Sequence, residues 1–130
     1  MITVNNKEEL KAIINQRIEE QGPNCDLNDI DVSGIVDMSL LFFNTDFNGD
    51  ISDWDVSNVR DMSFMFCRSK FNGDISRWDV TSVEDMCCTF LESHFNGDIS
   101  NWNVCAYEMT SMFRESTLEV NDKIPTWYRE

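Results

Sequence analysis

The sequence predicts an α/β solenoid of 24-residue coils, each with a short strand and a short helix, behind an N-terminal capping helix. Two observations predict this fold: one segment recurs at a fixed period, and the spacing of apolar residues changes within each period. The octapeptide 47–54, Phe-Asn-Gly-Asp-Ile-Ser-Asp-Trp, recurs with one substitution at 71–78 and 95–102, so the period is 24 residues. A period of this length is typical of units that bury their apolar faces only by stacking on one another.

The repeat begins before its first full copy and ends irregularly. Residues 31–38 match 55–62 and 79–86 at the same 24-residue spacing, so we expect a partial coil from about Leu27. After residue 102 the register slips by one residue, and an Ile-x-x-Trp spacing returns at 124–127, which we interpret as an atypical last coil. The sequence thus predicts one domain, 1–130, with a helical cap (1–26), repeat coils (27–117) and a closing segment (118–130).

The N-terminal segment has the pattern of an amphipathic helix. Asn5 or Asn6 can serve as its N-cap, and the helix is expected to run to about Glu20. Its apolar residues share one face: Leu10, Ile13, Ile14 and Ile18. We expect this helix to cover the open end of the stack.

Each coil divides into two halves. Trp54 and Val56 alternate with polar residues, which predicts a strand of about three to five residues with one buried face. The apolar spacing within 59–66 predicts a short helix, with Ser57 or Asn58 as its N-cap. The segment Asn-Gly-Asp at 48–50 and its copies supply the turn to the next strand. In this arrangement the tryptophans and methionines are core residues rather than an aromatic platform or a soft metal site.

The repeat unit carries a resemblance to a known family. The pattern Phe-Asn-Gly-Asp-Ile-Ser-x-Trp-Asp-Val-Ser-Asn-Val-x-Asp-Met-Ser-x-Met-Phe at 47–66 resembles the repeat of the BspA-type leucine-rich-repeat surface proteins, also found in mycoplasma lipoproteins and in short proteins of large DNA viruses and protists. The resemblance covers about Leu27 to Trp127. It implies a right-handed, leucine-rich-repeat-like solenoid used for binding, without catalytic residues. Because no signal peptide, lipobox or wall anchor is visible, we expect an intracellular or virion-associated protein.

Charge limits the class of partner. The chain has 24 acidic and 10 basic residues, and its formal net charge is −14. Phosphate backbones and anionic lipids would repel such a chain, so we expect neither nucleic acid nor a membrane as partner. No apolar run is long enough for a transmembrane helix.

Candidate catalytic and metal-binding residues are few. The five cysteines show no CxxC spacing and are expected to be reduced, and His94 is the single histidine, so we predict neither zinc nor another cofactor. Cys87 and Cys88, placed on a helix, are expected to point in different directions. Asp29–Gly34 resembles half of a calcium loop but has Leu40 where the closing Glu belongs. Stacked aspartates could bind calcium or only shape the turns: Asp50, Asp74 and Asp98. We expect no enzyme.

The predicted binding surface is acidic. If Trp54 and Val56 point inward, Asp53 and Asp55 point outward, and the 24-residue spacing aligns two outer rows. One row holds Asp31, Asp55, Asp79 and Asn103; the other holds Asp29, Asp53, Arg77 and Asn101. We predict a non-enzymatic protein–protein interaction scaffold that binds a basic protein partner through this outer strand face. Two alternatives stay open: the aspartates only cap turns, or the chain is a structural component of a viral particle or larger assembly without a discrete ligand.

Overall fold

The computed structural model describes residues 1–129, and its longest regular element is the N-terminal helix α1, Lys7–Gln21. The Asn6 side chain accepts the N–H of Glu9 at 2.9 Å and caps the helix, which ends at Gly22 with a φ of 88°. Leu10 and Ile14 are buried, and the other two residues of the predicted apolar face are partly buried against the core. The sequence prediction of this helix is confirmed. Neither helix of the described chain is long and apolar enough to cross a membrane.

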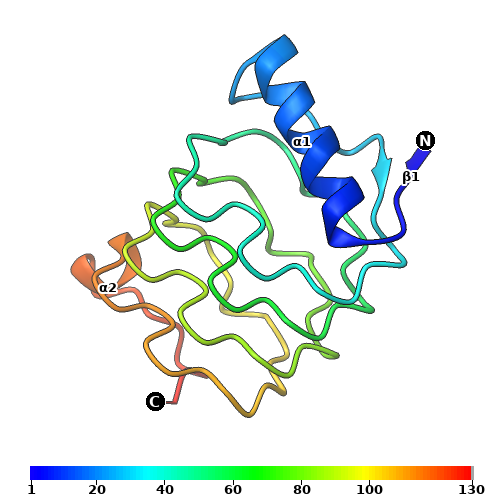
Figure 1. Cartoon of the computed structure of the whole chain (residues 1–130). Coiled ribbons are helices and arrows are strands. Elements are labelled where there is room, and N and C mark those ends of the chain that lie inside the picture. Colours follow the sequence, from blue (N-terminus) through cyan, green and yellow to red (C-terminus); the bar gives the residue numbers. More distant parts are fainter. Residues whose placement is uncertain (130) are drawn as a thin grey trace.

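Two short strands and a second helix complete the regular structure. The strand β1, Ile2–Thr3, pairs in parallel with β2, Ile30–Asp31, and both lie beside α1 at one end of the molecule (Figure 1). The helix α2, Thr117–Val120, lies at the opposite end and is capped by the side chain of Ser116, which accepts the N–H of Glu119. The predicted division into cap, coils and closing segment remains a prediction, and residue 130 lies outside the described residues.

The predicted fold class is wrong. Within residues 1–129 the helices are α1 and α2 and the one sheet is the β1–β2 pair, so the structure is not an α/β, leucine-rich-repeat-like solenoid with a strand and a helix in every coil. The predicted strand at Trp54 and Val56 is absent, since the N–H of Trp54 donates to the carbonyl of Ile51 at 3.2 Å and closes a turn. The predicted helix at 59–66 is replaced by turns as well.

Backbone conformation explains the missing helix. Phe64 and Arg68 have φ values of 57° and 54°, in the left-handed region, which an α-helix does not tolerate. Each sits third in a four-residue turn, closed by hydrogen bonds from Met65 N to Met62 O and from Ser69 N to Phe66 O, both 3.1 Å. Corresponding residues in the other repeats share this conformation: Leu40, Asn44, Cys88, Glu92, Ser111 and Glu115.

These turns free alternate N–H groups to bond the next repeat. Met62, Phe64 and Phe66 donate to carbonyls 23 residues later, at 2.9, 3.0 and 2.9 Å. Isolated parallel bridges join Asp37 to Asp61, Asp61 to Asp85, and Asp85 to Glu108. Successive repeats therefore lie side by side as irregular segments (Figure 1), held by separate hydrogen bonds rather than by continuous strands.

Phenylalanine rings form two columns through the core. In one, Phe66 stacks on Phe42 and Phe90 at centroid distances of 5.7 and 5.5 Å. In the other, Phe71 stacks on Phe47 and Phe95 at 6.0 and 6.2 Å. All six rings are at most 1% exposed, so each repeat adds two rings to a continuous apolar core.

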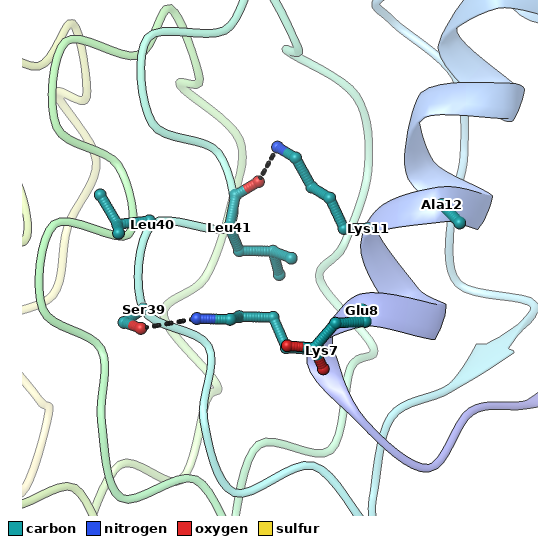
Figure 2. A pocket seen from close by; sticks show the side chains of 7 residues that line it. All are labelled: Lys7, Glu8, Lys11, Ala12, Ser39, Leu40 and Leu41. Atoms are coloured by element: carbon teal, nitrogen blue, oxygen red, sulfur yellow. Dashed lines mark hydrogen bonds between the residues drawn. The ribbon is translucent and has the colours of Figure 1, made fainter.

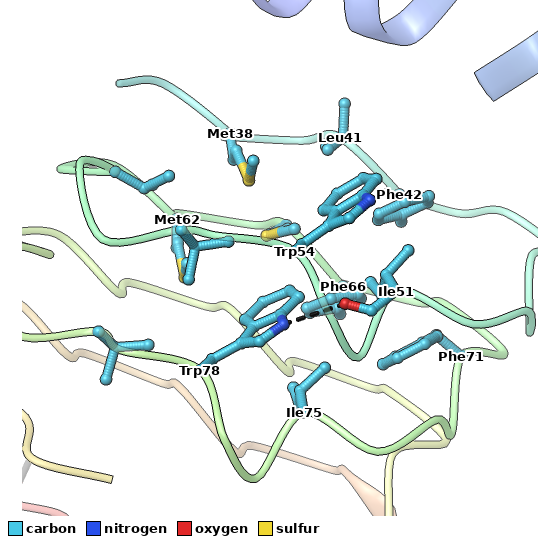
Figure 3. Close-up of a cluster of buried hydrophobic side chains, with 14 of the residues drawn as sticks. Met38, Leu41, Phe42, Ile51, Trp54, Met62, Phe66, Phe71, Ile75 and Trp78 are labelled. Atoms are coloured by element: carbon cyan, nitrogen blue, oxygen red, sulfur yellow. Dashed lines mark hydrogen bonds between the residues drawn. The ribbon is translucent and has the colours of Figure 1, made fainter. Parts of the chain in front are cut away.

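The tryptophans form a third column, beside the phenylalanines (Figure 3). Trp54 and Trp78 stack at 6.5 Å, and each indole N–H donates to a carbonyl of the preceding repeat, as Trp78 does to Ile51 at 3.1 Å. Trp102 and Trp127 stack at 6.4 Å and make the same kind of bond. Five of the six repeat methionines are buried and the sixth is partly buried: Met38, Met62, Met65, Met86, Met112 and Met109. The prediction that tryptophan and methionine form the core is confirmed.

Candidate interaction site

Eleven acidic residues share one local structure. In each, a carboxylate oxygen accepts the backbone N–H two residues later at 2.8–3.1 Å, a side-chain turn typical of aspartate. The residues are Asp26, Asp31, Asp37, Asp50, Asp55, Asp61, Asp74, Asp79, Asp85, Asp98 and Glu108. The sequence signal is an acidic residue, an apolar residue and then usually Ser or Thr, three times per repeat, and the 24-residue period alone does not reveal it. Eleven of the 24 acidic residues therefore hold turns of the backbone in place.

The first predicted row lies on the surface and takes part in these turns. Asp55 accepts both the backbone N–H and the hydroxyl of Ser57, and Asp79 accepts the same pair of groups from Thr81. Asp31 is partly buried and accepts from Ser33 N at 3.0 Å, and Asn103 is exposed. These aspartates shape turns, as one of the alternatives predicts, although no helix follows them.

Ion pairs dominate the second predicted row. Arg17 of α1 holds Asp29 through two hydrogen bonds of 2.9 and 2.6 Å, and this bonding lowers the pKa of the Asp29 carboxyl. Arg77 Nη2 lies 3.0 Å from Asp53 Oδ1, which links two successive repeats. Asn101 is exposed. This row is therefore less acidic than the row of Asp55 and Asp79.

The aspartates of the Asn-Gly-Asp segments are exposed, and each uses one carboxylate oxygen in a local turn. Asp50, Asp74 and Asp98 each accept the N–H and hydroxyl of the serine two residues later. No cluster of three or more His, Cys, Asp or Glu side chains within residues 1–129 could hold a metal ion. The geometry of these residues is that of turns.

We expect acid to destabilise the fold through these turns. Hydrogen bonds from a serine hydroxyl and then a serine N–H lower the pKa of Asp50, Asp74 and Asp98 below 3.8. A carboxyl with a lowered folded pKa stabilises the fold above its unfolded pKa of about 3.9 and loses that contribution as the pH falls through the folded pKa. Urea midpoints should therefore fall below about pH 4. Asp50→Asn with Asp74→Asn keeps the acceptors without a titrating group and should flatten this dependence; an unchanged slope would contradict the assignment.

A hollow of about 340 Å³ lies between α1 and the first repeat, and residues of both line it (Figure 2). Lys11 Nζ donates to the Leu41 carbonyl at 2.6 Å, and burial lowers the pKa of this lysine. Lys7 Nζ lies 3.2 Å from Asp37 and 2.9 Å from Ser39 Oγ. Both ammonium groups thus tie α1 to the first repeat, and the sequence analysis gave no sign of this contact. His94 is exposed and lies outside the hollow's lining.

Comparison with known proteins identifies a family whose pattern matches this chain. The family described as "Mycoplasma protein of unknown function, DUF285" matches residues 9–127, which include most of α1 and all the repeats. No curated protein and no solved structure matches the chain. Since the match spans nearly the whole chain, this protein belongs to the DUF285 family.

Proposed function

We propose that this chain is a non-enzymatic protein–protein interaction module, which binds a basic partner through the acidic outer face around Asp55 and Asp79. The carboxylate geometry of these two residues carries the proposal. Each uses Oδ1 for the two donors of its turn, while Oδ2 has no hydrogen-bond partner among residues 1–129. One exposed oxygen per repeat is thus held ready for a Lys or Arg side chain.

Preorganisation makes this face suited to recognition. An aspartate already fixed by two hydrogen bonds loses little side-chain entropy when a partner binds. The flanking ion pair of Arg77 with Asp53 is exposed on both sides and contributes little stability, so it can rearrange toward a partner. The remaining residues of the two predicted rows, Asp29, Asp31, Asn101 and Asn103, would extend this face, since each lies 24 residues from a residue already named.

The family relationship supports a finer assignment. We propose that the chain is related to the BspA-type repeat proteins, because the repeat unit at 47–66 resembles theirs. The match to a family of Mycoplasma proteins agrees with this relationship. The relationship supports a binding role but names no partner.

A charge-only substitution tests the proposal. Asp55→Asn with Asp79→Asn keeps the turn acceptors and removes two charges. A partner identified by cross-linking to the wild-type protein should associate about tenfold more slowly with this variant at low salt, measured by surface plasmon resonance with the purified partner. Asp122→Asn with Glu19→Gln removes two exposed charges elsewhere and is the matched control. Equal association rates for the two variants would contradict the proposal.

The same positions have a separate effect on stability. Asp55→Ala with Asp79→Ala removes two acceptors and should lower the free energy of unfolding by about 1 kcal/mol per site, because two turns lose their hydrogen bonds. The asparagine pair should stay within about 0.5 kcal/mol of the parent. Urea unfolding followed by circular dichroism measures both. If alanine and asparagine behave alike, the turn bonds contribute nothing measurable.

A further inference from the structure

Cys87 and Cys88 lie together on the surface of the third repeat. Their Sγ atoms are 3.3 Å apart and both residues are half-buried, so the expectation that the two side chains point in different directions is wrong. The reason is local backbone conformation. Cys88 has a φ of 58° and is third in a turn closed by Thr89 N and Met86 O, which turns its side chain back toward Cys87. In the helix predicted there, adjacent side chains would diverge by about 100°.

The main chain around the pair is fixed by four hydrogen bonds. Cys87 N donates to Asp85 Oδ1 at 2.9 Å, and the Cys87 carbonyl accepts from Phe64 N at 3.0 Å. Cys88 N donates to Thr110 O at 3.0 Å, and its carbonyl accepts from Leu91 N at 3.2 Å. Closing a disulfide requires the sulfurs to approach to about 2.05 Å, and rotating this dipeptide would strain all four bonds. A ligand atom that bridges two separate sulfurs requires no such rotation.

A hydrogen bond between the two sulfurs joins the unliganded pair. Burial, followed by the hydrogen bond with Cys88, raises the pKa of the Cys87 thiol to about 12, so Cys87 carries its proton at neutral pH. The chain also offers no third metal-ligating side chain here, within residues 1–129, for ions that need four protein ligands. The ligand that fits is a soft centre satisfied by two sulfurs.

We propose that Cys87 and Cys88 form a dithiol site that chelates trivalent arsenic compounds. With an organic arsenoxide, two S–H bonds and the arsenic–oxygen bond break, and two arsenic–sulfur bonds form. The two thiol protons leave with the oxide oxygen as one water molecule. Arsenic stays trivalent and both sulfurs stay at the thiol oxidation level, so the step needs no oxidant or reductant.

Phenylarsine oxide tests this site on the full chain. Wild-type protein should bind one phenylarsenic group that survives excess glutathione, a monothiol, and leaves with dimercaptopropanol, a dithiol, as measured by intact mass. Cys87→Ser and Cys88→Ser should each lower the apparent affinity about 100-fold or more, because one remaining sulfur loses the chelate advantage. Both variants should fold, since Ser63 and Ser111 occupy the corresponding positions of neighbouring repeats. Cys105→Ser, which removes an exposed thiol elsewhere, should bind like wild type.

Two results would overturn the proposal. One is a wild-type adduct that glutathione removes, and the other is a serine variant that keeps the resistant adduct. If a serine variant unfolds, peptide mapping of the wild-type protein still decides. Phenylarsine oxide should protect Cys87 and Cys88 together from alkylation after brief denaturation, and protection of any other cysteine pair would place the arsenic elsewhere.

Discussion

Replacing Trp78 with alanine should lower the free energy of unfolding by about 3–5 kcal/mol. The indole is 4% exposed, stacks on Trp54 and packs near Phe66, so its removal leaves a cavity between two neighbouring repeats. The change also leaves the Ile51 carbonyl without the indole N–H that it accepts at 3.1 Å. Urea unfolding, followed by far-ultraviolet circular dichroism, measures the effect.

Trp78→Phe separates the two contributions. It keeps an aromatic ring in the column and removes mainly one of the two hydrogen bonds that the Ile51 carbonyl accepts, since Trp54 N still donates to it, so the expected cost is smaller, about 0.5–1.5 kcal/mol. A Trp78→Ala protein within about 0.5 kcal/mol of the parent would contradict the stacked core. A phenylalanine variant as unstable as the alanine variant would assign the effect to the hydrogen bond instead of the packing.

Gly49→Ala should be at least as damaging, with an expected loss of about 4 kcal/mol or more. A Cβ at this position would overlap the carbonyl oxygen of Cys25 and would lie 2.7 Å from Cε1 of Phe47. The backbone has little room to move, because the same Cys25 carbonyl accepts from Asp50 N and the Asp50 carbonyl accepts from Leu27 N. The substitution thus forces apart two segments that the hydrogen bonds hold together.

Gly34→Ala is the matched control. Nothing lies within 4 Å of its added Cβ, and its backbone is outside the left-handed region. Alanine there should leave the protein equally stable or stabilise it by about 0.4–1 kcal/mol through the unfolded chain. Thermal unfolding of the two alanine variants should differ by many degrees, and similar melting temperatures would refute the close approach at Gly49.

Sequence reasoning succeeded where one residue type has one physical role. The 24-residue period correctly placed Trp54, Trp78 and Trp102 in equivalent buried positions, and Asn6 with its apolar face defined α1. It failed at 59–66, because apolar residues three and four apart fit both a helix and two successive turns. Only the left-handed φ of Phe64 separates these structures, and phenylalanine gives no sign of that conformation.

The candidate sites were predictable to different degrees. Alternation placed Asp53 and Asp55 outside, and both are exposed. Their hydrogen bonds were not predicted, although the Asp-x-Ser spacing carries a known turn preference. The contact between Cys87 and Cys88 depends on the φ of Cys88 and on bonds to the adjacent repeats, which no local pattern of the sequence specifies.

The tryptophan column should determine the intrinsic fluorescence of the folded protein. Buried indoles with equivalent hydrogen bonds experience nearly the same polarity, so Trp54, Trp78 and Trp102 should emit at similar, short wavelengths. Rings 6.5 Å apart exchange excitation energy readily, so emission from the folded protein should lose the polarisation of the exciting beam much faster than the molecule tumbles. Native fluorescence anisotropy thereby becomes a direct optical report of whether neighbouring repeats remain in register.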